Sequence, residues 1–384
     1  MAVTPAPRSL APVSRLLEDG VGRAYPGAVI AVLFRGEVVL RQAVGVVAHK
    51  PAPRAATPAT IYDLASLTKV VATTPLILQA AVEDRLGLDD PLSTHIPDSP
   101  HSGITLRHLL THTSGLPAWI PFYLEESGYE AIVRRAAAVS PESPPGARVV
   151  YSDLGFILLG EVARRSLGAP LDTLARTRLF APLGMSDTGY LPTQEMRGRI
   201  APTEDGTAIE QGMAGEAGRR YRWRQRLLWG EVHDSNAYAM GGVSGHAGVF
   251  GTADDLIAYA RMWLAEGRGP RGPILPPDLM RQATTTQMAG QTPAHMAAQA
   301  GPQVTGAASR GLGWALSGSQ GWWGDRLSAR AYGHTGFTGT ALVVDPEHDL
   351  AIVFLTNAVH LGRDRTEILA LRPHVATAVA RALL

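Results

Sequence analysis

The chain has 384 residues, a formal net charge of +1 at pH 7, 45% hydrophobic and 18% charged residues, and no cysteine. This balance is that of a globular protein, and a net charge so near zero supplies no overall field that would attract nucleic acid or anionic lipid. The absence of cysteine excludes disulfides, thiolate catalysis and cysteine-ligated metal sites.

Residues 1–17 lack a basic start followed by an unbroken apolar core, which is the pattern of an export signal. No later run comes close to about 18 consecutive apolar residues, so no membrane span is expected. We therefore expect a cytoplasmic protein, with a secreted or periplasmic location less favoured.

The two ends of the chain predict one antiparallel sheet and two helices. Residues 9–25 space apolar side chains at helical intervals and place Pro12 in the first turn, where its missing N–H costs little. Residues 27–45 are two apolar, β-branched runs divided by a short turn, which is typical of a β-hairpin. Residues 338–357 repeat the order strand, turn and strand, and residues 372–384 predict a closing helix.

The middle of the chain, residues 64–229, predicts mostly helices joined by Pro- and Gly-rich connections. Thr105 is the N-cap of one of them, and Gly168 closes another that covers residues 153–167. A further helix is expected after Thr252, because acidic residues stand in its first turn.

Together these elements predict an α+β fold with two lobes. Residues 1–63 and 230–384 form an α/β sandwich lobe, an antiparallel sheet flanked by the terminal helices. Residues 64–229 form the mostly helical lobe, and the active site is expected in the cleft between the lobes. Residues 118–128 are expected to be a loop, and residues 284–310 a long loop or a weak helix.

Only two of the 35 lysine and arginine residues are lysines, and Lys69 stands three residues after Ser66. If a helix begins near Ser66, the amine can reach the hydroxyl, because positions i and i+3 share one face. A serine hydroxyl is a poor nucleophile until a neighbouring base removes its proton. Lysine can be that base where burial and nearby positive charge lower its pKa, whereas arginine cannot. The plainer alternative is a capping serine followed by an exposed lysine.

Two further segments offer groups that such a site requires. Tyr151 ends an extended segment directly before a predicted helix, and a phenol between lysine and serine could carry the proton to the leaving atom. His334, Thr335 and Gly336 stand on a predicted strand, where the glycine lets a substrate approach the backbone closely.

These residues resemble the serine β-lactamase and penicillin-binding-protein superfamily. The resemblance covers nearly the whole chain and rests on three motifs in order: Ser66-x-x-Lys69, Tyr151-Ser152-Asp153 and His334-Thr335-Gly336. The tyrosine of the middle motif is typical of the class C β-lactamase-like branch. That branch also includes D-alanyl-D-alanine carboxypeptidases, D-aminopeptidases and family VIII carboxylesterases.

The resemblance implies that Ser66 is the nucleophile and that Lys69 and Tyr151 form the base system. It also implies an oxyanion hole made by the backbone N–H groups of Ser66 and Phe337. A water activated by Tyr151 would later release the acyl group. No metal and no cofactor are implied.

Four residues are implied to bind the substrate: Asp153, His334, Thr335 and Gly336. Two of them depart from the family's pattern. Class C β-lactamases usually have asparagine at the position of Asp153, and an aspartate can only accept hydrogen bonds and also favours a charged Lys69. His334 replaces a lysine, so a permanent cation becomes a group that is mostly neutral at pH 7. Both changes favour a neutral ester or amide substrate over efficient β-lactam turnover.

Several functions stay open on the sequence. The first is ester hydrolysis through an acyl-Ser66 intermediate, with weaker action on β-lactams or D-amino-acid amides. The alternatives are a D-amino-acid peptidase or carboxypeptidase, a true class C-type β-lactamase, and an acylated sensor or binding module without turnover. The expected partner is a small-molecule ester or amide, and the sequence leaves the oligomeric state open.

Two other patterns were weighed against plainer interpretations. Residues 219–230 hold five arginines and three aromatics, and a solvated arginine-rich loop is favoured over nucleic-acid binding because no basic stripe accompanies them. The spacing of His233, Asp234, His246 and His360 matches no common metal site, so structural roles are favoured.

Overall fold

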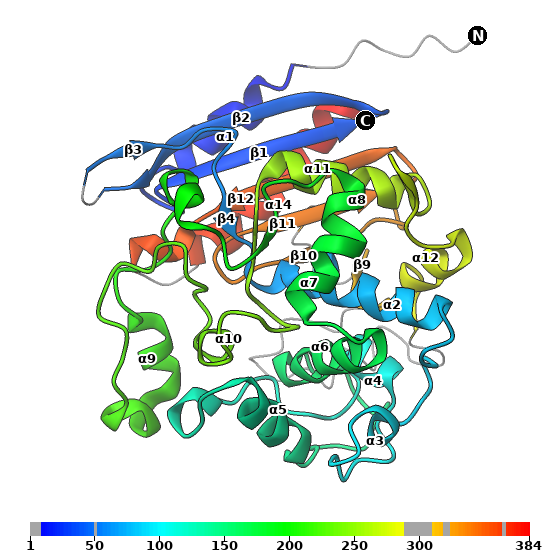
Figure 1. Cartoon of the computed structure of the whole chain (residues 1–384). Coiled ribbons are helices and arrows are strands. Elements are labelled where there is room, and N and C mark those ends of the chain that lie inside the picture. The colour runs from blue at the N-terminus through cyan, green and yellow to red at the C-terminus, as the bar shows by residue number, and fades with distance from the viewer. Residues whose placement is uncertain (1–8, 50–51, 288–308, 318–322, 363–365) are drawn as a thin grey trace.

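The computed structural model describes residues 9–49, 52–287, 309–317, 323–362 and 366–384, and the chain adopts the predicted α+β fold (Figure 1). A seven-stranded antiparallel sheet has the order β3-β2-β1-β12-β11-β10-β9. Its strands are β1 (Gly27–Phe34), β2 (Glu37–Ala48), β3 (Arg54–Ala55), β9 (Ala315–Leu316), β10 (Tyr332–Thr335), β11 (Ala341–Asp345) and β12 (Leu350–Thr356).

The two predicted hairpins lie side by side in this sheet. β1 pairs with β12 in a register that runs from Ala28 opposite Thr356 to Phe34 opposite Leu350. The first and last parts of the chain therefore share one hydrogen-bonded layer, as the sequence predicts.

The terminal helices cover one face of the sheet, and α11 (Ala253–Leu264) covers the other (Figure 1). α1 (Ala11–Gly20) and α14 (Thr366–Leu383) pack together in an apolar cluster that includes Ile30 and Val32 of β1. The alternate β1 residues, such as Val29, face the larger cluster on the opposite side. A strand buried on both faces is apolar throughout, which explains the continuous hydrophobic run.

Both terminal helices differ from their predicted limits. α1 ends at Gly20 instead of residue 25, because Val21 takes an extended conformation with φ −64° and ψ 132°. α14 begins at Thr366 and carries Pro373 in its interior, whereas a helix from residue 372 was expected. Proline usually marks a helix start because it removes an internal hydrogen bond. In α14 the buried apolar face outweighs that preference.

The middle of the chain supplies most of the remaining helices. They are α2 (Thr74–Val82), α3 (Leu92–His95), α4 (Leu106–Leu110), α5 (Tyr129–Ala138), α6 (Asp153–Leu167), α7 (Leu171–Ala175), α8 (Ala181–Leu183) and α9 (Ala208–Ala214), followed by α10 (Ser235–Ala239) and α12 (Pro277–Ala283). The predicted caps are present: the side chain of Thr105 accepts from the His108 N–H, and Gly168 ends α6 in the left-handed conformation. Thr252 likewise caps α11.

Short strands join the helical part to the sheet. β4 (Tyr62–Asp63), β6 (Val249–Gly251) and β5 (Gly189–Tyr190) form a small sheet in the order β4-β6-β5, and β7 (Arg268–Gly269) pairs with β8 (Gly272–Pro273). Strands of two or three residues are too short for a periodic signal, so the sequence did not predict them.

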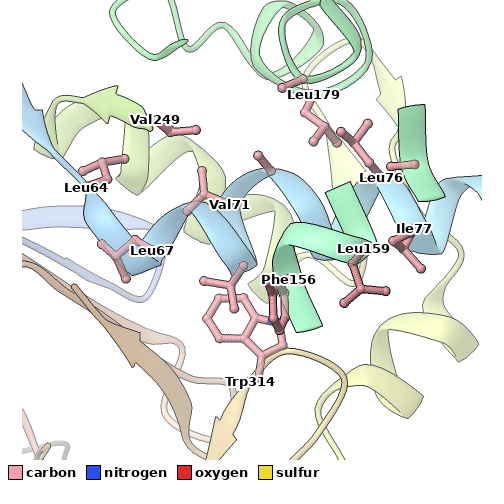
Figure 2. Packing of buried hydrophobic residues seen from close by; sticks show 14 of the residues in the cluster. Leu64, Leu67, Val71, Leu76, Ile77, Phe156, Leu159, Leu179, Val249 and Trp314 are labelled. Carbon is pink, nitrogen blue, oxygen red and sulfur yellow. The ribbon is translucent and has the colours of Figure 1, made fainter. Parts of the chain in front are cut away.

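One apolar cluster extends from the inner face of the sheet into the helices. Figure 2 shows part of it around the helical run that begins near Ser66, with Val71 and Ile77 on the run, Phe156 on the neighbouring α6, and Trp314 below them in this view. All four are fully buried. The run therefore packs at the centre of the molecule. The predicted division into lobes at residues 63 and 229 stays a prediction.

This helical run is also strongly apolar. Over the described residues, Ala65–Val82 is one helical stretch with the length and mean hydropathy, 1.3, of a membrane-crossing helix. The sequence analysis expected no such stretch. Because 78% of it is buried inside the protein, it has the character of a core helix.

Candidate active site

Ser66 stands where β4 leads into the central helix. A single 3-10 turn, Ala65–Leu67, is followed by a π-helical segment, Lys69–Thr73, and then by α2. Ala65 adopts φ +47°, a left-handed conformation that costs a residue with a Cβ about 1–2 kcal/mol. Such strain concentrates at functional sites. The turn leaves Ser66 half-buried at the start of the helix, as the motif requires.

The side chain of Lys69 is fully buried and reaches back to the serine. Its Nζ lies 2.9 Å from Ser66 Oγ, 3.2 Å from the backbone carbonyl oxygen of His246 and 2.7 Å from Asp153 Oδ1. The exposed-lysine alternative is therefore wrong. The i, i+3 spacing places the two groups in contact, as the helical interpretation predicts.

Two opposing influences act on the pKa of Lys69. Burial lowers the pKa of Lys69, but Asp153 and Tyr151 oppose it more strongly and hold that pKa above its ordinary value. From the sequence, a lysine base requires a pKa lowered by burial and positive neighbours, whereas Asp153 is expected to favour the charged amine. The Asp153 carboxylate lies 2.7 Å away and its effect prevails, so the resting protein favours the ammonium form of Lys69.

Tyr151 lies against the same two groups. Its ring centre is 4.9 Å from Lys69 Nζ, and both Lys69 and Ser66 are close enough to its hydroxyl to act on its pKa. Burial raises the pKa of Tyr151, with Lys69 acting in the opposite direction. The resting tyrosine is therefore a phenol, placed where it can exchange a proton with both neighbours.

The third motif forms the opposite wall on β10. The His334 ring centre is 5.8 Å from that of Tyr151, and its Nδ1 is 2.8 Å from the carbonyl oxygen of Thr335. Burial, Lys69 and the Arg310 guanidinium hold the pKa of His334 well below its ordinary value. A neutral His334 agrees with the expectation from the sequence.

Gly336 begins the turn that follows this strand. A Cβ at this position would lie 2.5 Å from the carbonyl oxygen of Leu64, so only glycine allows the turn to pack against the segment that precedes Ser66. Phe337 follows, and its ring stacks on the ring of His233 with 5.7 Å between centroids. The residues predicted from the three motifs are thus brought together by segments far apart in the chain.

Two residues beside Tyr151, Arg310 and His112, were not predicted from the sequence to belong to this site. The Arg310 guanidinium carbon lies 5.7 Å from the Tyr151 ring centre, and burial lowers the pKa of Arg310 to about 10. No carboxylate pairs with Arg310 among the residues that the structure describes. It belongs to the predicted loop 284–310, most of which lies outside the described residues, and no local pattern marks it.

The second such residue is His112, whose ring centre is 4.5 Å from that of Tyr151. Its Nδ1 accepts a hydrogen bond from the Ser152 N–H at 3.0 Å, so Nε2 carries the proton. Burial, above all, keeps the pKa of His112 well below its ordinary value. No role of His112 in this site was predicted from the sequence. Its left-handed backbone, with φ +58°, was not visible in the pattern.

One group of side chains has the spacing of a cation site. Ligand atoms of Asp153, Asp234 and His246 lie within 4.8 Å of one another. The Lys69 ammonium is in contact with this group, 2.7 Å from Asp153 Oδ1, and supplies the positive charge that the carboxylates require. The arrangement therefore fits an internal ion-pair network.

The other predicted metal candidates also have protein partners. His233 Nε2 is 2.9 Å from Glu204 Oε2, His246 Nε2 is 2.9 Å from Asp234 Oδ1, and His360 Nδ1 is 2.9 Å from the Thr203 carbonyl oxygen. These contacts agree with the structural roles that the sequence analysis favoured.

Arg224 and Arg226, two arginines of the arginine-rich segment, residues 219–230, form polar contacts within the protein. Arg224 is buried and donates to the carbonyl oxygens of Val232 and His233, and Arg226 pairs with Glu231. The other four arginines are exposed, as the predicted solvated loop requires, whereas the burial of Arg224 differs from that prediction.

The protein-family model described as "Beta-lactamase" matches residues 13–376. The chain is 30% identical over 380 residues to an Escherichia coli (strain K12) protein named "Putative D-alanyl-D-alanine carboxypeptidase", covering 91% of this chain and 82% of that protein. It is 29% identical over 389 residues to "N-acetylmuramyl-L-alanine amidase" of Bacillus subtilis (strain 168), covering 92% and 82%.

Solved structures share the fold. One is titled "EstCE1, a hydrolase with promiscuous acyltransferase activity". It superposes with a TM-score of 0.71 at 21% identity and covers 96% of this chain and 98% of its own. At this level of identity the likeness concerns the fold.

Proposed function

The chain belongs to the beta-lactamase family of serine hydrolases, and we propose that it cleaves carboxylic esters through a covalent acyl-Ser66 intermediate. The observation that carries the proposal is the contact of Lys69 Nζ with Ser66 Oγ at 2.9 Å, beside Tyr151. A nucleophile and a base within hydrogen-bonding reach are the signature of nucleophilic catalysis.

The proposed reaction begins with the proton of Ser66. Because Lys69 is an ammonium and Tyr151 a phenol at rest, one proton must leave this coupled pair before it can act as a base. The Ser66 Oγ then attacks the ester carbonyl carbon, and its proton passes to the pair. The backbone N–H groups of Ser66 and Phe337 are proposed to stabilise the oxyanion.

The intermediate then collapses and is hydrolysed. The bond to the alkoxide breaks, the pair returns a proton to the departing oxygen, and an acyl-Ser66 ester stays behind. A water that gives its proton to Tyr151 attacks this ester, releases the carboxylic acid and restores the serine. Activity should therefore increase with pH as the fraction of the deprotonated pair increases.

Two features support an ester substrate. The neutral His334 provides no fixed cation from the third motif to hold a carboxylate. Asp153, in contact with Lys69, accepts hydrogen bonds where an asparagine amide would donate them to the acyl side chain of a β-lactam.

A second candidate function is hydrolysis of D-amino-acid peptides at their carboxyl end. It is favoured by Arg310, a buried cation beside Tyr151 that could hold a substrate carboxylate. The name of the Escherichia coli relative points the same way. Class C-type β-lactam hydrolysis is proposed as a weaker activity of the same site.

The test is a substrate panel of p-nitrophenyl butyrate, nitrocefin and D-alanyl-D-alanine peptides, measured with the wild type and Ser66→Ala. We expect the ester to be the best substrate and Ser66→Ala to be inactive on all three. Ester hydrolysis that survives Ser66→Ala contradicts the acyl-enzyme. A burst of one equivalent without turnover supports an acylated sensor instead.

A cytoplasmic location stays part of the proposal. Cell fractionation with an antibody against the chain tests it, and recovery from the periplasm or the medium contradicts it.

A further inference from the structure

Asp63 joins three segments that surround Ser66, and we infer that it is the residue that aligns the oxyanion hole. The inference rests on the proposed function, because it concerns the groups that would stabilise the tetrahedral intermediate. Asp63 ends β4, lies three residues before Ser66 and is 1% exposed. Both of its carboxylate oxygens and its backbone carbonyl oxygen accept hydrogen bonds within the protein.

The first of these bonds shapes the turn before the nucleophile. Asp63 Oδ1 accepts a hydrogen bond from the Ala65 N–H at 2.8 Å. An aspartate that binds the backbone N–H two residues later in this way stabilises a turn. Ala65 is held in the left-handed conformation, which a residue with a Cβ rarely adopts. Since Ser66 follows directly, this turn sets the direction of the Ser66 N–H.

The second bond fixes the turn that carries Phe337. The Thr338 hydroxyl donates to the Asp63 carbonyl oxygen at 2.7 Å. Next to it, the Thr340 hydroxyl donates to the Leu64 carbonyl oxygen at 3.1 Å. Residues 63 and 64 thus hold the segment that directly follows the proposed oxyanion donor, Phe337.

The third bond fixes the packing partner of the Phe337 ring. Asp63 Oδ2 accepts from the His233 N–H at 2.7 Å, and the His233 ring stacks on that of Phe337 at an interplanar angle of 23°. His233 is also held by Glu204. Asp63 therefore acts on both backbone segments of the proposed hole, through its carboxylate on Ala65 and His233 and through its carbonyl oxygen on Thr338. Because Asp63 acts through these segments, it is a positioning residue.

The chemistry requires a carboxylate at this position. Two oxygens accept from two N–H groups, of Ala65 and His233. Asparagine has one acceptor oxygen, so its amide NH₂ would face the other N–H, donor against donor. Asp63→Asn therefore keeps the size of the side chain and breaks the alignment.

The experiment compares Asp63→Asn with the wild type on p-nitrophenyl butyrate and with phenylboronic acid, which forms a tetrahedral adduct on a nucleophilic serine. We expect kcat to fall by at least about tenfold with KM within about twofold, because misaligned donors weaken only the tetrahedral state. The affinity for the boronic acid should fall in parallel with kcat/KM.

A matched control is Asp345→Asn. Asp345 is also buried, and it accepts hydrogen bonds from Ser328 at the opposite end of β11 from the site. It should lower the Tm with kcat unchanged. A folded Asp63→Asn variant whose kcat and boronic acid affinity stay within about twofold of the wild type overturns the inference.

Two further measurements distinguish a failure of the Asp63 inference from a failure of the proposed function. If Asp63→Asn does not fold, Thr338→Val removes one donor to the Asp63 carbonyl oxygen, and an unchanged kcat in that variant overturns the inference. Labelling of wild-type Ser66 by a fluorophosphonate, read by mass spectrometry, tests the proposed function separately. A wild type that is neither labelled nor active contradicts the proposed function, whereas a labelled wild type with an equally active Asp63→Asn contradicts only the role of Asp63.

Discussion

The two sides of the Ser66 site differ in whether their buried polar groups have partners inside the protein. On one side, the Lys69 ammonium is paired with Asp153 and with the His246 carbonyl oxygen. On the other side, Arg310 Nε and the Nε2 atoms of His112 and His334 are buried and have no hydrogen-bond partner among the described residues.

We expect the Lys69 side and the Arg310 side to have different functions. A buried charge that is paired inside the protein has a protonation state fixed by the protein, so the Lys69 side determines the chemistry. Buried polar groups without partners are costly unless a ligand completes them. The Arg310 side is therefore the side on which the substrate is expected to bind.

The largest expected effect is that of Lys69→Arg. Arginine keeps the positive charge beside Asp153 but cannot release its proton to act as a base. We expect kcat/KM on p-nitrophenyl butyrate to fall by about 10³-fold or more, the scale seen when one member of a catalytic group is removed. Activity within tenfold of the wild type would contradict the role of Lys69 in proton transfer.

Tyr151→Phe should have the next largest effect. The variant keeps the ring between His112 and His334 and removes only the hydroxyl. We expect a fall in kcat of about 10²-fold, because general acid–base catalysis contributes about 10²–10⁴-fold. Thermal unfolding serves as the control, and a lower Tm with an unchanged kcat would assign Tyr151 a packing role alone.

Arg310→Gln should affect substrates selectively. Removing the guanidinium, which pairs with no carboxylate in the described part of the chain, should lower kcat/KM for a D-alanyl-D-alanine peptide about tenfold more than for the neutral ester, since a charge-assisted contact to a carboxylate is lost. Arg310→Lys, which retains the charge, should restore part of the peptide activity. Equal losses on both substrates would show that Arg310 acts on the Tyr151 environment and not on a substrate carboxylate.

The smallest effect expected is that of Asp153→Asn, which changes the pH dependence. The Asp153 carboxylate raises the pKa of Lys69, so an amide in its place should lower that pKa. The free amine then forms at lower pH, and the rising limb of the kcat/KM profile should move to lower pH by about one unit. A shift to higher pH would show that Asp153 does not control the ionisation of the base.

Much of the fold could be predicted from short-range patterns. The hairpin of β1 and β2, the Thr105 and Thr252 caps and the Gly168 C-cap all depend on neighbouring residues, and the structure has each of them. The limits of the terminal helices could not be predicted, because tertiary packing decides where α1 stops and allows Pro373 inside α14.

The same distinction applies to the site. The sequence alone determined that Ser66 and Lys69 share a helical face, because that spacing is local. Only the tertiary structure decided that the effect of Asp153 on the pKa of Lys69 outweighs that of burial, since Asp153 comes from another helix and burial depends on the whole core. It also decided that Arg310 lies beside Tyr151 and that Asp63 contacts the distant residues His233 and Thr338. Charge and burial depend on distances in space, and a sequence pattern records only distances along the chain.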